Sequence, residues 1–374
     1  MKKTKSEDTV SGFGMKMKVA VLGAGSAGLA TAAYLAIKGC RVNLYNRSEE
    51  RLDSINKKGG IDLSAHPNAG VEEGFARLGK ITTNLKEALE GVDFVMVTTV
   101  ANGHKGIAEA CVEYLKKGQT IVFVPGYGGA LECARIFEMR RMKEEICIAD
   151  TMTLFFSCRT IGAAQVRVTF MMNRLPLAAF PSRKTGVIVD ELKKYLPVIP
   201  ARDVLETALL NCNPVIHPAP TILNMATVEK NKNATSYGEV MSHNVLKCLD
   251  SVDLERRELC KALGYDIRSM DDIYYYYLGT GPTYRPLLST IKEVQSTIYR
   301  QEERFITEDV PYGLVPWASL GDMLGVPTPT IDAVIQFASV MKDTDYWKTG
   351  MTLESLGIAG LDRAKLSKYL SEGR

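Results

Sequence analysis

The stretch KVAVLGAGSAGLATAAYLAIKG, Lys18–Gly39, decides the fold. It begins with an apolar run, Val19–Leu22, that predicts a buried strand, and continues into small and apolar residues that predict a helix. Between them, Gly23, Gly25 and Gly28 have the G-x-G-x-x-G spacing of a dinucleotide-binding turn. The first glycine permits a tight turn, the second lets a pyrophosphate approach the backbone, and the third lets the helix pack closely on the strand. This order of elements indicates a Rossmann-type nucleotide site.

The N-terminus of the predicted helix is expected to hold the phosphates, because its first N–H groups are free and its dipole is positive there. Ser26 and Ala27 begin this helix, so they join the glycines as predicted cofactor contacts. The run Val19–Ile37 has no charged residue, and its length alone also fits a membrane span or a secretory signal. Alanine and glycine dominate it, however, so we expect a chain without a membrane segment, located in the cytoplasm.

Length and composition suit a globular protein of two domains. The chain has 374 residues, 46% hydrophobic and 24% charged, which is more than one small core requires. A formal net charge of +3 is too small to indicate a nucleic-acid partner. The eight cysteines are scattered with no C-x-x-C pair, so we expect neither a metal site nor disulfides. Residues 1–15 are polar and are expected to form a disordered leader.

The residues after the second predicted strand, Arg41–Tyr45, bear on the choice of cofactor. An NAD site usually has an Asp or Glu there to bind the ribose 2′-hydroxyl. This chain has Asn46, Arg47 and Ser48 instead. No carboxylate repels a phosphate at that point, while Arg47 and Ser48 are able to bind one. We therefore predict NADPH, with NADH as the alternative in which Arg47 is merely solvated and Glu49 or Glu50 binds the ribose.

Strands and helices continue to alternate along the chain, which predicts an α/β Rossmann-type, doubly wound parallel sheet. The next predicted strands are Val92–Val97, Thr120–Val124 and Ile146–Ala149, and the predicted helices are Asn84–Gly91 and Gly106–Lys117.

Ligands of such sheets bind outside the carboxyl ends of the strands. The loops Thr98–His104 and Pro125–Gly129 are therefore expected beside the nicotinamide, with Thr99 and Val100 as cofactor contacts.

The pattern changes after Met152. Alternating stretches such as Gln165–Phe170 predict strands that complete the sheet, antiparallel to the rest, and Leu196–Pro200 predicts a linker. Beyond it, strand signals nearly vanish. The predicted helices are Val204–Leu210, Pro218–Glu229, Tyr237–Leu263, Tyr284–Tyr299, Trp317–Leu324 and Thr330–Met341. We therefore expect a dinucleotide-binding domain over 16–200 and an all-α substrate and catalytic domain over 201–374.

The segment NCNPVIHPAPTILN, Asn211–Asn224, contains the strongest candidate for chemistry. Prolines are tolerated in the first turn of a helix, so Pro218 and Pro220 place His217 at or just before a helix N-terminus. That position favours a neutral imidazole and a nearby substrate anion. The alternative is that His217 only caps a helix. His104 is the rival histidine, because it lies on a predicted nicotinamide-side loop, although there it also fits a plain helix start.

Three segments together resemble the octopine/nopaline (opine) dehydrogenase family. They are the His217 segment, ERFITEDVPYGLVP at Glu303–Pro316 and GVPTPTIDAVI at Gly325–Ile335. The resemblance runs over nearly the whole chain past the leader. It implies a Rossmann domain followed by an all-helical domain. It also implies NAD(P)H-dependent reduction of the imine formed from an α-keto acid and an amino acid, which are then the small-molecule partners.

The same resemblance implies roles for single residues. The catalytic histidine of the family matches His217, and its arginine and aspartate, five residues apart, match Arg304 and Asp309. The segment TMTLFFSCR is also similar to a family segment, which makes Arg159, with Asn213, a predicted substrate contact. Phe155-Phe156 stand where the family has Pro-Trp, which puts the role of Arg159 and the pocket shape in question.

The residue chemistry is consistent with that reading. A histidine suits reversible proton transfer near neutral pH, an aspartate fixes its tautomer, and an arginine binds a carboxylate. The alternative for Arg304 and Asp309 is an ordinary charged surface loop, and the tyrosine run Tyr274–Tyr277 fits interdomain packing. Two rival functions are a 2-keto acid reductase that needs no amine and a protein that senses NADPH without turnover. A homodimer is the assembly considered.

Overall fold

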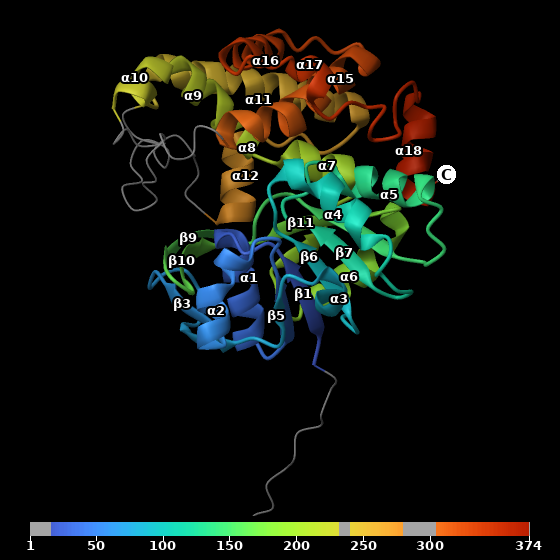
Figure 1. Cartoon of the computed structure of the whole chain (residues 1–374). Helices are drawn as coiled ribbons and strands as arrows, with labels where there is room; N and C mark the ends of the chain where they lie inside the picture. Colours follow the sequence, from blue (N-terminus) through green and yellow to red (C-terminus); the bar gives the residue numbers. More distant parts are fainter. Residues whose placement is uncertain (1–15, 232–239, 280–303, 374) are drawn as a thin grey trace, which may run out of the picture.

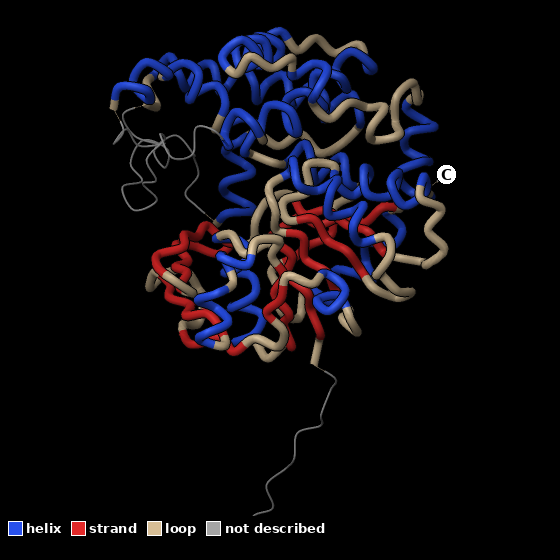
Figure 2. Tube along the Cα trace, viewed as in Figure 1, coloured by secondary structure: helices blue, strands red, loops and turns tan. Residues whose placement is uncertain are grey.

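The computed structural model describes residues 16–231, 240–279 and 304–373 (Figure 1). Two parts follow one another along the chain. Figure 2 shows the strands gathered in one part and a layer of helices packed over it. Within the described residues no strand follows Pro200. The chain therefore has an N-terminal Rossmann-type part and a C-terminal helical part, as predicted.

An eight-stranded sheet forms the centre of the first part. Its strand order is β12-β11-β8-β7-β6-β1-β2-β5. In that order the strands are Val198–Pro200, Leu175–Phe180, Cys147–Thr151, Thr120–Phe123, Phe94–Val97, Lys18–Leu22, Arg41–Tyr45 and Ile81–Thr82. All neighbouring pairs are parallel except β8 and β11. The strand order reverses at β1, whose carboxyl end is therefore the place where a ligand is expected to bind.

The helices of this part connect the parallel strands. They are α1 Ser26–Ile37, α2 Asp53–Lys58, α3 Leu85–Leu89, α4 His104–Cys111, α5 Gly129–Met139 and α6 Thr185–Leu192. Short 3-10 turns lie at Glu49–Arg51, Ala101–Gly103 and Ser182–Lys184. The predicted helix Gly106–Lys117 is wrong at both ends, since α4 begins at His104 and ends at Cys111.

A second sheet corrects one prediction. Its order is β4-β3-β10-β9, with β3 Gly60–Ala65, β4 Gly74–Arg77, β9 Phe156–Gly162 and β10 Gln165–Met171. The alternating stretches after Met152 were expected to complete the main sheet, but only β11 does so, antiparallel to β8. Strands β9 and β10 pair with each other and, through β3, form the separate sheet. Their alternation suits a sheet with one buried face, whereas the interior strands of the main sheet are buried on both.

Helix α1 lies between the two sheets (Figure 1). It contacts β1 and β2 on one side and β3, β4, β9 and β10 on the other. All residues from Gly28 to Leu35 are buried. Because α1 is packed between two sheets, this stretch has no charged residue and many small ones. A membrane span would not require the small residues.

The predicted linker is also corrected. Val198–Pro200 is strand β12, the edge of the main sheet, and pairs in parallel with β11. The amide of Leu175 donates to Pro197 and that of Ala201 donates to Leu177. Proline is tolerated on an edge strand, because one row of its backbone groups faces away from the sheet.

The second part is helical. Its elements are α7 Val204–Leu210, α8 Asn213–Ile216, α9 Pro218–Leu223, α10 Met225–Lys230, α11 His243–Leu263, α12 Met270–Ile273, α15 Val315–Leu324, α16 Pro329–Met341, α17 Tyr346–Thr349 and α18 Arg363–Glu372, with π-helical turns at Tyr274–Leu278 and Val310–Leu314. The predicted helix Pro218–Glu229 is two helices, α9 and α10. The predicted helix Tyr284–Tyr299 lies outside the described residues.

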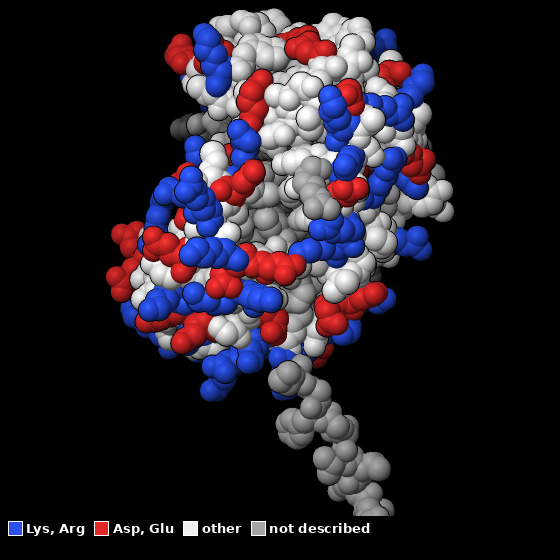
Figure 3. Space-filling model, turned by 90° about the vertical axis from the view of Figure 1, so that its right-hand side faces the viewer, with Lys and Arg blue, Asp and Glu red and all other residues white. Residues whose placement is uncertain are grey.

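On one face of the molecule the two signs of charge are mixed. Figure 3 shows Lys and Arg interspersed with Asp and Glu over the face it presents. None of the helices that the structure describes is long and apolar enough to cross a membrane. Across the described ranges, no three His, Cys, Asp or Glu side chains are grouped so as to hold a metal ion.

Candidate active site

The glycine turn has the geometry that a dinucleotide requires. Gly23 has φ +120°, a conformation that side chains rarely adopt. A Cβ on Gly28 would lie 1.8 Å from the carbonyl oxygen of Gly23, so only glycine permits this approach of helix to strand. Gly25 has no atom within 4 Å of where its Cβ would be, which leaves the space open. No side chain caps the N-terminus of α1, so its free N–H groups can receive a pyrophosphate.

The end of β2 is joined to this turn by Asn46. Its side-chain oxygen accepts from the backbone N–H of Ala24 at 3.1 Å, and its amide nitrogen donates to the carbonyl of Ser48. Asn46 therefore shapes the turn as well as lying at the predicted cofactor position. Arg47 and Ser48 are exposed, as a group that meets an incoming 2′-phosphate must be.

The loop after β6 lies against the same turn. Thr98 donates its hydroxyl to the carbonyls of Leu22 and Gly23 at 3.1 and 3.3 Å. The hydroxyl oxygen of Thr99 is buried without a hydrogen-bond partner among the described residues, and the Val100 side chain is 41% exposed. An unpaired buried hydroxyl beside a nucleotide turn fits a bound polar group.

Ser26 has a second role. Its hydroxyl oxygen accepts from the backbone N–H of Thr160 on β9 at 3.0 Å. The start of α1 is thereby tied to the second sheet. Ala27, beside it, is half-buried.

His217 and Asp309 form a buried pair in the helical part. His217 lies between α8 and α9, with Pro218 as the first residue of α9. Its Nδ1 is 2.7 Å from the Oδ2 atom of Asp309, and both side chains are less than one-tenth exposed. The Phe305 ring stacks on the imidazole at a centroid distance of 3.9 Å and an angle of 14°. Nε2 makes no hydrogen bond to a described residue, so it is the nitrogen available to a substrate.

The surroundings of His217 favour its neutral form. Burial is the largest influence and lowers the pKa of His217 below its usual value. The Asp309 carboxylate opposes this effect, while the guanidinium groups of Arg304 and Arg159 add to it. The predicted substrate arginines therefore lie close enough to the imidazole to act on its charge.

Tyr127 connects the Rossmann part to this pair. It lies in the loop after β7, at φ +51°, and its hydroxyl donates to the Oδ1 atom of Asp309. Burial raises the pKa of Tyr127 well above its usual value, so the hydroxyl keeps its proton. The side-chain amide of Asn213 donates to the same hydroxyl oxygen at 3.2 Å. Both oxygens of the Asp309 carboxylate are thus held in place.

Glu308 makes a second connection. Its Oε1 accepts from the backbone N–H of Ala101, in the loop after β6, at 2.9 Å. Its Oε2 lies 3.6 Å from the Nε of Arg304. Burial raises the pKa of Glu308 to about 7, and the neighbouring Asp309 adds to the rise, while Arg304 opposes it. Two adjacent carboxylates of the helical part therefore contact two loops of the Rossmann part.

His104 is placed differently. It is the first residue of α4, only 1% exposed, and its ring packs on Phe123 at 4.9 Å. Burial lowers the pKa of His104 to about 4, with the Thr99 backbone opposing part of the shift. It contacts neither Asp309 nor solvent, which fits the plain helix start.

Sequence reasoning missed Tyr127, Glu308 and Phe305. The loop that contains Tyr127 had been placed beside the nicotinamide, so an aromatic hydroxyl in it was a usable signal. Glu308 precedes Asp309, for which a charged surface loop was the alternative, yet Glu308 is only 4% exposed. Tyr127 and Asp309 are 182 residues apart in the chain, so no local sequence pattern predicts their hydrogen bond.

Comparisons with known proteins agree with a Rossmann-type part followed by a helical part. Residues 200–342 match the family described as NAD/NADP octopine/nopaline dehydrogenase, alpha-helical domain. Residues 18–126 match the N-terminus of NAD-dependent glycerol-3-phosphate dehydrogenase. An opine dehydrogenase of Arthrobacter sp. (strain 1C) is 35% identical over 356 residues, covering 92% of this chain and 96% of that protein.

Solved structures share the fold. An octopine dehydrogenase in complex with NADH and agmatine superimposes with a TM-score of 0.74 at 17% identity, over 96% of this chain and 98% of that one. A yersinopine dehydrogenase with NADP+ bound gives a TM-score of 0.67 at 14% identity over the same shares.

Proposed function

Since the chain belongs to the octopine/nopaline (opine) dehydrogenase family, we propose how its own residues carry out that family's reaction. It is an NAD(P)-dependent oxidoreductase acting on CH–NH donors, and it condenses an α-keto acid reductively with an amino acid. The observation that carries the assignment of roles is the buried contact between Nδ1 of His217 and Asp309, with Nε2 left available.

His217 moves the proton in this proposal. When bound, NAD(P)H would supply the hydride that the carbon of the C=N bond takes up. The Nε2–H of the His217 imidazolium supplies the proton that the nitrogen takes up, so one C=N bond becomes one CH–NH bond. Asp309 accepts a hydrogen bond from Nδ1–H, which fixes the tautomer and stabilises the imidazolium. In the oxidative direction the neutral ring takes the proton back.

Arg304 and Arg159 bind substrate carboxylates. Guanidinium–carboxylate contacts are charge-assisted and suit the carboxylates of a keto acid and an amino acid. Both arginines lower the pKa of His217 when no substrate is present. A carboxylate on each arginine offsets its positive charge, so substrate binding raises that pKa and helps to charge the acid. Asn213 is the further substrate contact that we propose, beyond its bond to Tyr127.

NADPH is the proposed preferred cofactor, with NADH as the alternative. The exposed Arg47 and Ser48 after β2 support this choice. The pyrophosphate is proposed on Gly23, Gly25, Ser26, Ala27 and Gly28, with Asn46, Thr99 and Val100 completing the contacts.

The domain boundary is proposed at 200/201. Strand β12 ends at Pro200 and Asp203 caps α7, so the short segment between them supports a hinge.

The cytoplasm is the proposed compartment, supported by cysteines that are all free thiols. A homodimer stays a prediction, for light scattering to check.

Initial rates of NADPH oxidation test the assignment. Pyruvate and 2-oxoglutarate are each assayed alone and with a panel of amino acids. Turnover that requires both substrates is the expected result. Equal rates with the keto acid alone would instead establish the rival 2-keto acid reductase, and no turnover with any pair would leave a nucleotide sensor.

A further inference from the structure

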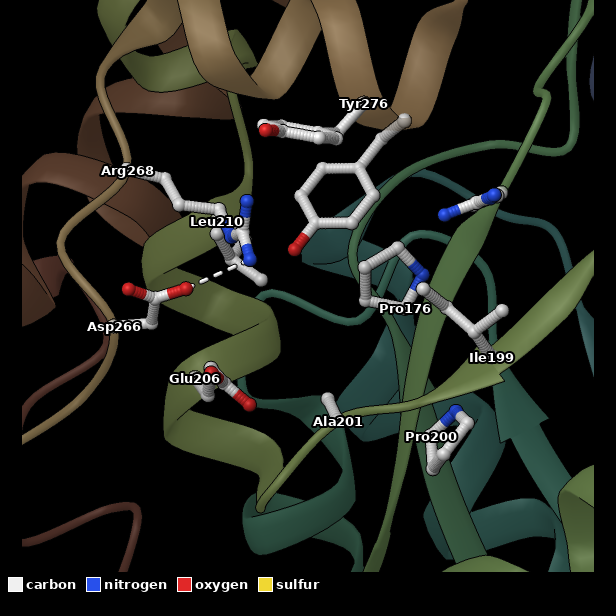
Figure 4. Close-up of a pocket in the computed structure, with 11 residues that line it drawn as sticks. Pro176, Ile199, Pro200, Ala201, Glu206, Leu210, Asp266, Arg268 and Tyr276 are labelled. Carbon is white, nitrogen blue, oxygen red and sulfur yellow. Dashed lines mark ion pairs between the residues drawn. The ribbon is translucent and has the colours of Figure 1, made fainter.

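A cavity of about 260 Å³ lies where the edge of the main sheet meets the helical part (Figure 4). Pro176, Ile199 and Pro200 form the wall on the side of β11 and β12. Glu206 on α7 and Arg268 before α12 lie on the opposite wall, near the tyrosines of the π-helical turn. None of the lining residues belongs to the cofactor turn or to the group around His217.

Two lining residues of opposite charge have no ion-pair partner within 4.0 Å among the described residues, namely Arg174 and Glu206. The backbone N–H of Arg174 donates to the carbonyl of Tyr277 at 3.0 Å, which fixes this residue at the cavity. One carboxylate oxygen of Glu206 accepts from the backbone N–H of Arg202 at 2.6 Å. Glu206 is half-buried, and burial raises its pKa, so an incoming cation would stabilise its charged form.

The remaining charges of the cavity satisfy each other. Arg268 pairs with Asp266 at 2.7 Å, shown as a dashed line in Figure 4. The guanidinium of Arg268 also lies over the rings of Tyr276 and Tyr277, at 4.9 and 5.6 Å. One positive and one negative group are therefore left for a ligand.

The size and the apolar surface limit what fits. At roughly 30 Å³ per water molecule, the volume corresponds to about nine water-sized spaces, which suits a ligand of about ten non-hydrogen atoms. Its apolar lining comes from Pro176, Ile199, Pro200, Ala201 and Leu210. Such a ligand needs one carboxylate, one ammonium and a short apolar side chain.

We propose that this cavity is a second small-molecule site, which binds an apolar α-amino acid as a zwitterion. Its carboxylate pairs with Arg174, its ammonium with Glu206, and its side chain packs on the prolines and Ile199. The site is separate from the reaction described above and does not depend on it. Because both parts of the chain wall the cavity, an occupant contacts both at once.

Hydrogen exchange on the full-length protein without cofactor tests this site, with L-leucine as the probe at up to about 10 mM. Protection is expected in peptides covering 199–210 and 266–277, with a dissociation constant between about 10 µM and 1 mM. Arg174→Gln and Glu206→Gln should each weaken binding at least tenfold. Arg183→Gln is the matched control, since Arg183 is exposed and does not line the cavity.

Two further measurements separate this site from the active site. His217→Asn and Arg304→Gln should leave the protection of 199–210 and 266–277 unchanged. Leucine methyl ester, which lacks the carboxylate, and 4-methylpentanoate, which lacks the ammonium, should each bind at least tenfold more weakly. The proposal is overturned by the absence of protection, by protection confined to 211–224, or by 4-methylpentanoate binding as tightly as leucine.

Discussion

At the scale of single residues, the charge of the imidazole is set by its neighbours. Burial and two arginines act against the imidazolium of His217, and Asp309 acts for it. The free protein therefore holds a neutral ring at neutral pH. A substrate that brings carboxylates to the arginines changes this balance in the direction that reduction requires.

The first prediction concerns pH. In the oxidative direction kcat/KM should fall at acid pH with a pKa below 6.5, because it reports free His217. The pKa seen in kcat should be higher, because bound carboxylates offset Arg304 and Arg159. In the reductive direction both profiles should instead fall at alkaline pH, because the imidazolium is the form that donates the proton. His217→Asn should lose about 10²–10⁴-fold in turnover yet still bind NADPH. Equal pKa values in kcat and kcat/KM would contradict the role of the arginines.

The second prediction concerns Tyr127. Tyr127→Phe keeps the ring but removes the donor to Asp309, and a hydrogen bond to a charged group contributes about 1.5–3 kcal/mol. We expect kcat to fall about ten- to a hundredfold, with KM for NADPH unchanged. The pKa of His217 should rise, because Asp309 loses a donor that shares its charge. Tyr114→Phe, at a half-buried position in the turn that follows α4, is the control. An unchanged pH profile would show that Tyr127 only packs against its neighbours and does not act on His217.

The third prediction concerns the cofactor. Arg47→Ala should raise KM for NADPH at least tenfold and leave that for NADH nearly unchanged, because a charge-assisted contact to the 2′-phosphate is lost. Arg51→Ala serves as the control, since Arg51 is exposed in the next turn. A wild-type preference for NADH would refute this assignment.

At the scale of elements, two glycines of the same turn should affect different properties. We expect Gly28 to affect the stability of the fold and Gly25 to affect cofactor binding. Gly28→Ala places a Cβ against the Gly23 carbonyl, so overpacking of about 1–3 kcal/mol should lower Tm by several degrees. Gly25→Ala meets no atom within 4 Å, so Tm should stay the same while KM for NADPH rises at least tenfold. Thermal unfolding and initial rates check both variants. A stable Gly28→Ala variant would show that the turn relaxes.

The sequence pattern predicted those helices and strands whose bounds are set by residues adjacent in the chain. The strand–glycine–helix unit and α7 were found because turn residues, apolar runs and helix boundaries are written in adjacent residues. Strands β9 and β10 were found as strands but assigned to the wrong sheet, because their partner β3 lies about 100 residues earlier. The prolines of Leu196–Pro200 predicted a linker instead of β12, because the sequence does not show that this strand lies at the edge of the sheet, where proline is tolerated. The prolines after it singled out His217, its partner Asp309 came from family resemblance, and Tyr127 required the fold itself.

At the scale of the whole molecule, three hydrogen bonds join the parts beside His217, and one of them runs from Asn213 to Tyr127. Ala101 to Glu308 and Tyr127 to Asp309 both run from Rossmann loops to the helical part. The buried pair of His217 and Asp309 is therefore fully held only when the two parts meet. The segment between β12 and α7 is where we expect the chain to bend.

The fifth prediction is closure on binding. Small-angle scattering should give a smaller radius of gyration with NADPH and substrate than without them. Glu308→Ala, which removes the contact to Ala101, should weaken that change and raise KM for the substrates. Glu109→Ala, an exposed carboxylate on α4, should behave as wild type. Identical radii in all states would rule out closure.

The burial of α1 between two sheets also bears on how this chain can evolve. A larger residue along Gly28–Leu35 would push the sheets apart, so that stretch has little freedom to accept mutation. Arg47 and Ser48 lie outside the sandwich and are exposed. With the cofactor contacts that we propose, selection can therefore exchange one nicotinamide dinucleotide for the other at the end of β2 while helix α1 stays unaltered.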